Sequence, residues 1–401
     1  MKWPHTLSLV RGLGRICPGI LLVVNAFAQQ PDVTAKAAIL MDAESGTVLF
    51  EKNSRGNRQP ASTTKIMTAL IALERVPPGT MIAAPWDIEK VGESSLHLKA
   101  GETLTREDAL FALMLRSAND MAHTLAVHIA GSDNAFAKMM NTRAAEIGCK
   151  STNFANPHGL PNDKHTTSAY DLALIAREAM KNDFFRRIVA TQKWFVMRST
   201  NQKDLMVENN NKLLLEDAYI EGVKTGYTRA AGRCFVGSRN ENGLRLISVV
   251  LGSSDWGADT KALYAWGFGE LEVRARYAKG QIIGKVPFVG GYDDSVPVRT
   301  SGALVVFSPK SAPPLEITFE KQPAPIVEGG LAGKLRSVDS RGGFVEYPLV
   351  FAESREAKPL ILSVAGSWLT WTAMGVVGFS FVVFRGRKRH RRTRPVGIHA
   401  R

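Results

Sequence analysis

Apolar residues recur along this 401-residue chain at two spacings, which predict where helices and strands lie. After Pro60, which is a helix start signal, four apolar residues recur at three- and four-residue intervals and predict a helix with one buried face. These residues are Ile66, Met67, Leu70 and Leu73. Residues 38–42 and 47–50 are instead short apolar runs around a turn at Gly46, and they predict a β-hairpin at a sheet edge.

Further helical patterns come before the clearest strands. The predicted helices cover residues 105–114, 121–130, 134–147 and 168–180. The predicted strands cover residues 220–226, 233–238 and 244–251. The last two strands are joined across Asn242-Gly243, which supplies the positive φ of a hairpin turn. Strands at both ends with helices between them predict an α+β domain whose sheet is built from both ends, with a helical insertion.

The composition changes around Gly269. Residues 270–351 contain short alternating runs and Gly and Pro turns without helical periodicity, which predicts a small all-β domain. Residues 360–384 then carry no charge, and a helix of this length exceeds the ~30 Å hydrocarbon core of a membrane. We interpret this stretch as a transmembrane helix, because a buried core helix fits poorly with its length and the arginines that follow.

The basic charge is concentrated at the two ends of the chain. The formal net charge is +14, but residues 385–401 hold eight basic residues and no acid, and residues 1–28 hold three more. The remainder is close to neutral, at about +3, which argues against a nucleic-acid groove. By the positive-inside rule the tail is cytoplasmic and the body lies outside.

Residues 1–28 have the features of a secretory signal peptide. Two arginines precede a mostly apolar run, and Ala26-Phe27-Ala28 is a small-x-small cleavage site. An uncleaved anchor is the alternative, and cleavage is preferred because the apolar run is short. Cys149 and Cys234 could form a disulfide, although two separate buried cysteines are favoured. No pair of histidines has the spacing of a zinc site, so no metal or cofactor is expected.

A serine and a lysine stand three residues apart at the start of the first helical pattern. Ser62 and Lys65 would share one helix face, so Ser62 Oγ and Lys65 Nζ can meet. A serine hydroxyl becomes a good nucleophile when an adjacent base takes its proton. A lysine acts as that base when burial or a nearby cation lowers its pKa. By itself, however, this spacing is a common coincidence.

Two more short motifs follow in chain order. They are Ser117-Ala118-Asn119 and Lys224-Thr225-Gly226. Alone, the first could be a helix cap and the second the end of a strand. Together with Ser62 and Lys65, and in this order, they are typical of serine β-lactamases and penicillin-binding proteins.

The chain resembles a low-molecular-weight penicillin-binding protein, a serine-type D-alanyl-D-alanine carboxypeptidase of the peptidase S11 type. The similarity covers about residues 33–355, and it includes Asn156–Leu160, Thr167–Ala173 and Ala231–Val236. It implies an α+β domain like that of serine β-lactamases and DD-peptidases, with an antiparallel sheet and a helical insertion. The predicted segments are a signal peptide (1–28), the catalytic domain (29–267), a small β-rich domain (268–357), a transmembrane helix (360–384) and a basic cytoplasmic tail (385–401).

The resemblance implies a catalytic role for four residues. Ser62 attacks the carbonyl of the penultimate D-alanine and forms an acyl-enzyme, with Lys65 as the general base. Ser117 relays a proton to the leaving amine, and Asn119 holds Lys65 and the substrate amide.

The resemblance also implies how substrate binds. Lys224 and Thr225 bind the terminal carboxylate, and Gly226 leaves room for a peptide against the strand. Backbone N–H groups of Ser62 and Tyr227 form the oxyanion hole. Peptidoglycan stem peptides are the expected substrates, β-lactams the expected covalent inhibitors, and the inner membrane the expected location, with the catalytic domain on its outer side.

Several alternatives stay open. A DD-endopeptidase that cuts crosslinks, or a catalytically silent wall-binding scaffold, would share this sequence pattern, whereas a β-lactamase needs a further glutamate that cannot be placed. His158 and His165 could act as bases, but the motif set already has its base, and a loop-packing role is favoured for His158. Solvated or structural roles are favoured over carboxylate binding for three arginines: Arg229, Arg233 and Arg245. Tyr227 stands where the family often has histidine, and Gly252–Trp256 also departs from its pattern, which leaves substrate range and deacylation rate open.

Overall fold

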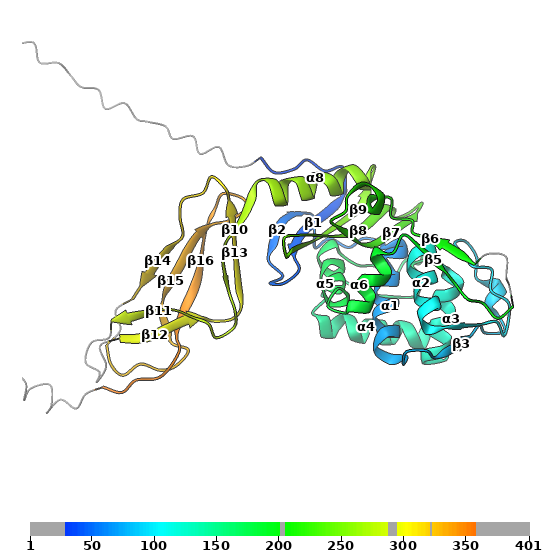
Figure 1. Cartoon of the computed structure of the whole chain (residues 1–401), viewed down its shortest axis with the longest axis horizontal. Helices are drawn as coiled ribbons and strands as arrows, with labels where there is room; N and C mark the ends of the chain where they lie inside the picture. The colour runs from blue at the N-terminus through cyan, green and yellow to red at the C-terminus, as the bar shows by residue number, and fades with distance from the viewer. Residues whose placement is uncertain (1–28, 201–204, 288–294, 321–322, 358–401) are drawn as a thin grey trace, which may run out of the picture.

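The computed structural model describes residues 29–200, 205–287, 295–320 and 323–357. A larger body of helices packed on a sheet is followed by a smaller body made of strands, and α8 (Trp256–Gly269) leads from one to the other (Figure 1). The predicted signal peptide, transmembrane helix and basic tail lie outside the described residues. Within those residues, no helix has both the length and the apolar character needed to cross a membrane.

The sheet of the larger body is antiparallel and joins the two ends of that body. Its order is β2 (Val48–Lys52), β1 (Ala37–Asp42), β9 (Leu244–Ser253), β8 (Gly232–Glu241) and β7 (Ile220–Thr228). Ala37 pairs with Leu251, so the first strand lies beside one of the last. This confirms the predicted sheet with a helical insertion, and it places β7 at an edge.

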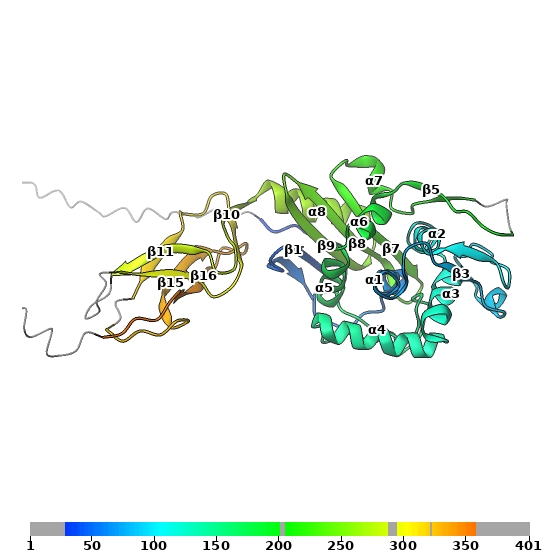
Figure 2. The ribbon, with the colours of Figure 1, turned by 60° about the horizontal axis from the view of Figure 1, so that its bottom comes forward.

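Both faces of this sheet are buried. Successive side chains of β1 point to opposite faces, and all of them are buried. Ile39 and Met41 pack with the helical insertion, whereas Ala38 and Leu40 pack with α8. The helices of the insertion are α1 (Lys65–Arg75), α2 (Arg106–Phe111), α3 (Asn119–Ala130), α4 (Asp133–Ile147), α5 (Ala169–Ala179) and α6 (Asp183–Ala190). In Figure 2 α1 is seen nearly end-on and α4 runs lengthwise across the view below it.

The helix starts follow the expected capping chemistry. Thr105 precedes α2 and its side chain accepts a hydrogen bond from the Asp108 N–H, and Ser168 does the same for Asp171 before α5.

The helices α6 and α8 were not predicted. Two short two-stranded sheets were also not predicted: β3 (Met81–Ala83) with β4 (Thr103–Thr105), and β5 (Lys193–Phe195) with β6 (Met206–Glu208).

The alternating pattern after residue 270 is that of strands. Here β10 (Leu271–Tyr277) pairs with β13 (Leu304–Pro309). A five-stranded antiparallel sheet has the order β11 (Ile282–Pro287), β12 (Ser295–Thr300), β16 (Phe344–Phe351), β15 (Leu331–Val338) and β14 (Glu316–Phe319). The two bodies touch at the β1–β2 hairpin, where Ser340 donates a hydrogen bond to the Leu49 carbonyl and Arg276 pairs with Glu44.

Candidate active site

Ser62 and Lys65 lie at the junction of two helical segments. Ser62 is in a 3₁₀ turn, η1 (Ala61–Thr64), and Lys65 is the first residue of α1. The prediction of a helix start here is confirmed, although the serine precedes the α-helix instead of lying within it. Ser62 Oγ is 3.0 Å from Lys65 Nζ, and the lysine side chain is fully buried.

The second motif reaches Lys65 from the other side. A π-helical turn, η3 (Ala112–Arg116), ends at Ser117, whose backbone is left-handed at φ 64°. This conformation costs a non-glycine residue about 1–2 kcal/mol, and it turns the chain so that α3 begins at Asn119. Asn119 Oδ1 accepts a hydrogen bond from Lys65 Nζ at 2.7 Å, and Ser117 is buried beside it.

The third motif lies on the edge strand β7, which packs against η1. A Cβ added to Gly226 would lie only 3.0 Å from Ser62 N and 3.1 Å from Thr63 N, so the strand passes directly over the serine. Lys224 is 2% exposed, and its Nζ donates to the Thr225 carbonyl at 3.2 Å. The structure therefore brings residues of all three motifs to one place: Ser62, Lys65, Asn119, Lys224 and Gly226.

Two buried lysines make the electrostatics of this place unusual. Burial, together with the positive charge of Lys224, lowers the pKa of Lys65 well below its usual value. Burial also lowers the pKa of Lys224 to about 7. Asp120 and Glu93 act in the opposite direction on Lys65. The net effect shifts Lys65 toward the neutral amine, which is the form that can accept a proton.

Backbone groups that were not predicted from the sequence complete the surroundings of Lys65. Lys65 Nζ donates to the His158 carbonyl at 2.6 Å. The following residue, Gly159, has φ 90°, and a Cβ there would lie 1.9 Å from the Ala61 carbonyl oxygen. Only glycine fits so close to the serine turn. The Asn156–Leu160 stretch signalled this loop, but a carbonyl acceptor has no side-chain signature.

Asp120 is a further structural residue beside the site that was not predicted from the sequence. Its buried carboxylate accepts hydrogen bonds from Ser95 Oγ at 2.7 Å, from the Leu96 N–H at 3.0 Å and from the Leu98 N–H at 3.1 Å. It thereby fixes the segment 95–98 beside α3. The position of Asp120, directly after Asn119, was the available signal.

The two histidines lie near the site without supplying a base. The ring of His158 accepts a hydrogen bond from the Leu160 N–H at 3.2 Å, and the ring of His165 lies 2.8 Å from Thr64 Oγ1. Burial lowers the pKa of His158 to about 3 and that of His165 to about 4. Both rings are therefore neutral and bonded to neighbouring groups, in agreement with the packing role favoured for His158.

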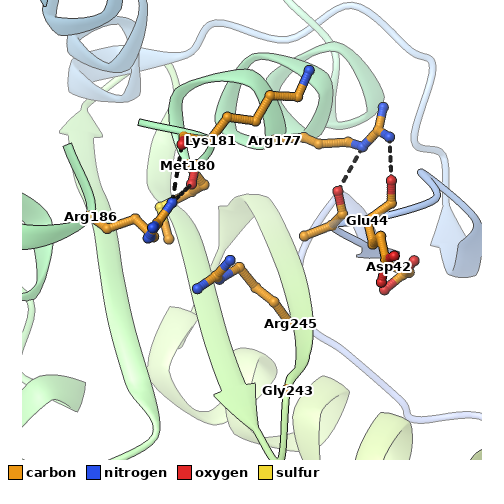
Figure 3. Close-up of a pocket in the computed structure, with 9 residues that line it drawn as sticks. Asp42, Glu44, Arg177, Met180, Lys181, Arg186, Gly243 and Arg245 are labelled. Carbon is orange, nitrogen blue, oxygen red and sulfur yellow. Dashed lines mark hydrogen bonds between the residues drawn. The ribbon is translucent and has the colours of Figure 1, made fainter. Parts of the chain in front are cut away.

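Arg245 lies away from the three motifs. It pairs with Glu221 at 2.6 Å and lines a hollow of about 400 Å³ at one end of the sheet. Figure 3 shows it with Arg177, which donates to the Glu44 carbonyl, and with Arg186, which donates to carbonyls at the end of α5. Arg177 and Arg186 hold backbone groups together, whereas the partner of Arg245 is a carboxylate. Charge pairing therefore explains Arg245 without a ligand.

The remaining candidates also have local roles. Arg233 donates to the Ser254 carbonyl at 2.8 Å, and Arg229 is exposed after the end of β7. Cys149 and Cys234 are both free thiols, so they do not pair with each other.

Comparison with known proteins agrees with this geometry. The family model described as D-alanyl-D-alanine carboxypeptidase, peptidase S11, matches residues 24–255. The chain belongs to this family. The predicted family and its activity class, a D-alanyl-D-alanine carboxypeptidase, are therefore confirmed. The predicted peptidoglycan substrates and β-lactam inhibitors fit the family.

Individual relatives cover most of the chain. The D-alanyl-D-alanine carboxypeptidase DacF of Bacillus subtilis is 30% identical over 90% of this chain and 99% of its own length. The fold is similar to that of penicillin binding protein 5 from Haemophilus influenzae, with a TM-score of 0.70, 25% identity and coverage of 82% and 99% of the two chains. It is also similar to the Streptomyces K15 DD-transpeptidase, with a TM-score of 0.57, 28% identity and coverage of 60% and 99%.

Proposed function

We propose that the chain removes the terminal D-alanine of peptidoglycan stem peptides through an acyl-enzyme on Ser62. The observation that carries this proposal is the set of three oxygen atoms around Lys65 Nζ. They are Ser62 Oγ at 3.0 Å, Asn119 Oδ1 at 2.7 Å and the His158 carbonyl oxygen at 2.6 Å.

This set suits a neutral amine. A neutral lysine has two N–H groups and one lone pair. The N–H groups donate to the Asn119 and His158 oxygens, which accept only, and the lone pair then faces the Ser62 hydroxyl. Lys65 takes the proton as Ser62 Oγ attacks the carbonyl carbon of the penultimate D-alanine. Burial and the charge of Lys224 favour this neutral form.

The wall opposite Ser62 suits the leaving half of the substrate. Lys224 and Thr225 bind the terminal carboxylate through one cation and one hydroxyl. The N–H groups of Ser62 and Tyr227 stabilise the oxyanion. Ser117 passes a proton to the departing D-alanine amine, and water then releases the shortened peptide from Ser62.

The finer location is also part of the proposal. The chain is exported by its first 28 residues and held in the inner membrane by residues 360–384, with the tail inside. Residues 268–357 form a separate β-rich domain between the catalytic domain and the anchor. The uncharged run and the basic ends of the sequence support this arrangement. Protease added to spheroplasts should digest the body and leave the tail, and protection of the body would refute it.

Labelling with a fluorescent penicillin tests the nucleophile. Wild-type protein should be labelled covalently, and Ser62→Ala should not be. Ser254→Ala removes an exposed serine hydroxyl from the same body and serves as the matched control. If Ser62→Ala is still labelled, the assignment of the nucleophile is wrong.

Digestion of pentapeptide-containing muropeptides tests the reaction. Release of free D-alanine with crosslinked dimers intact is the expected result. Loss of the dimers would indicate an endopeptidase instead, and unchanged muropeptides would indicate a silent wall-binding protein.

A further inference from the structure

Glu93 has a backbone conformation that glutamate rarely adopts. Its φ is 65°, in the left-handed region where asparagine, aspartate, histidine and glycine are favoured. Two of the other non-glycine residues with positive φ are Ala61, directly before the serine, and Ser117. Unfavourable backbone conformations concentrate at functional sites, where surrounding bonds hold them. The backbone of Glu93 therefore shares this unusual conformation with two residues of the site.

Asn119 holds the chain on both sides of Glu93. Its side-chain Nδ2 donates to the Gly92 carbonyl at 3.1 Å, and its backbone N–H donates to the Ser94 carbonyl at 2.7 Å. The same side chain accepts the bond from Lys65 Nζ. One asparagine thus fixes the catalytic lysine and the backbone that carries Glu93, and Asp120 fixes the residues that follow. The backbone on both sides of Glu93 is therefore tied to the residue that holds Lys65.

The Glu93 carboxylate serves no visible purpose in the fold. It is exposed, and it makes no hydrogen bond or ion pair with any residue that the structure describes. Its negative charge nevertheless acts on Lys65, and both of its chain neighbours are bonded to Asn119, so Glu93 lies beside the site. An exposed, unpaired carboxylate on a backbone fixed at this place is suited to a cationic group on an incoming molecule.

We propose that Glu93 is a specificity-determining residue that binds a positively charged amino group of the peptide, on the N-terminal side of the bond that is cleaved. This inference rests on the proposed function of the cleft. The terminal carboxylate of the peptide is taken by Lys224 and Thr225, and a second carboxylate would repel it. Glu93 therefore binds the part of the peptide that stays on Ser62 as the acyl group.

Two tripeptides test the proposal. Each has lysine before D-alanyl-D-alanine and a blocked N-terminus, and they differ only in a free or an acetylated lysine side chain. The wild-type protein should prefer the free amine about fivefold in kcat/KM, as for an ion pair that is partly removed from water. In Glu93→Gln, which keeps the size and the backbone requirement of the side chain, this ratio should fall below twofold, mainly through KM. Glu93→Gly, which relieves the left-handed backbone, should lose the preference equally.

Glu89→Gln is the matched control. It removes the same charge four residues away, where Glu89 pairs with Lys99 at the surface, and it should keep the fivefold ratio. An unchanged ratio in Glu93→Gln would overturn the inference. A longer-lived penicilloyl-enzyme with an unchanged ratio would also overturn it and assign the carboxylate to deacylation. Failure of the proposed function is distinguishable, because wild-type protein would then release D-alanine from neither peptide and the inference would fall with it.

Discussion

Replacing Gly226 by alanine tests whether the edge strand and the serine turn form one catalytic unit. The added methyl carbon would lie 3.0 Å from Ser62 N, 3.1 Å from Thr63 N and 3.2 Å from the Ala61 Cβ. Ordinary contacts begin at 3.4 Å, so β7 or the turn must move by about 0.2–0.4 Å. The contacts are mainly with backbone, so side-chain rotation cannot relieve them.

This shift should affect catalysis more than stability. The Ser62 N–H is one of the proposed oxyanion donors, and the methyl group also occupies space that the peptide needs beside β7. Loss of an oxyanion donor costs about 10²–10³-fold in rate, and misplacement by 1 Å costs about 10²-fold. We therefore expect penicillin acylation and D-alanine release to fall about 10- to 100-fold, with about 1–3 kcal/mol lost from the free energy of unfolding.

The measurement is the second-order rate constant of acylation by a fluorescent penicillin, together with a urea unfolding curve. Gly302→Ala is the matched control, since a Cβ there meets no described atom within 4 Å. That variant should acylate at the wild-type rate. Acylation of Gly226→Ala within threefold of wild type would refute the close packing of β7 on Ser62 as a catalytic requirement.

Three buried groups of the larger body give further expectations. Because the pKa of Lys224 is about 7, its ammonium loses the proton as pH rises through 7. The KM for a peptide with a free terminal carboxylate should therefore rise between pH 7 and 9, and a flat KM would contradict this. Asp120→Asn should lower the free energy of unfolding by about 1–3 kcal/mol, measured in urea, because one buried carboxylate accepts bonds from Ser95, Leu96 and Leu98. Phe111→Ala should lower it by about 3–5 kcal/mol, and a loss below 1 kcal/mol would show that this buried ring is not tightly packed.

The sheet and most helices were predictable because their side-chain periods are visible locally. The hairpin at 38–50 and the strands at 220–251 have clear apolar runs and turn residues, and Ser168 has a recognisable capping pattern. The helix α8 was not predicted because its apolar residues are spread around the helix instead of lying on one face. It packs on the sheet through Leu263 and Tyr264, in a core that also includes Phe307 of β13. Tertiary burial on more than one side removes the helical alternation from the sequence.

The site was predictable as a set of side chains, but its backbone partners were not. The order of the three motifs indicated that Ser62, Asn119 and Lys224 would meet, and the structure places them together. The His158 carbonyl and the left-handed backbone of Glu93 depend on loop conformation. A sequence shows neither, because any residue has a carbonyl and most loop residues have several accessible conformations.

The pairing of Ala37 with Leu251 has a consequence for how the protein matures. The two strands are far apart along the chain. The edge of β1 that pairs with β9 therefore has no partner until the ribosome has made most of the molecule. Contacts at such sequence separation form slowly. During this interval Ser62 and Asn119 have been synthesised, but β7, whose Gly226 packs on the Ser62 turn, has not. A polypeptide that stalls before that glycine should therefore have no reactive serine, which delays acylating activity until synthesis of the catalytic body is nearly finished.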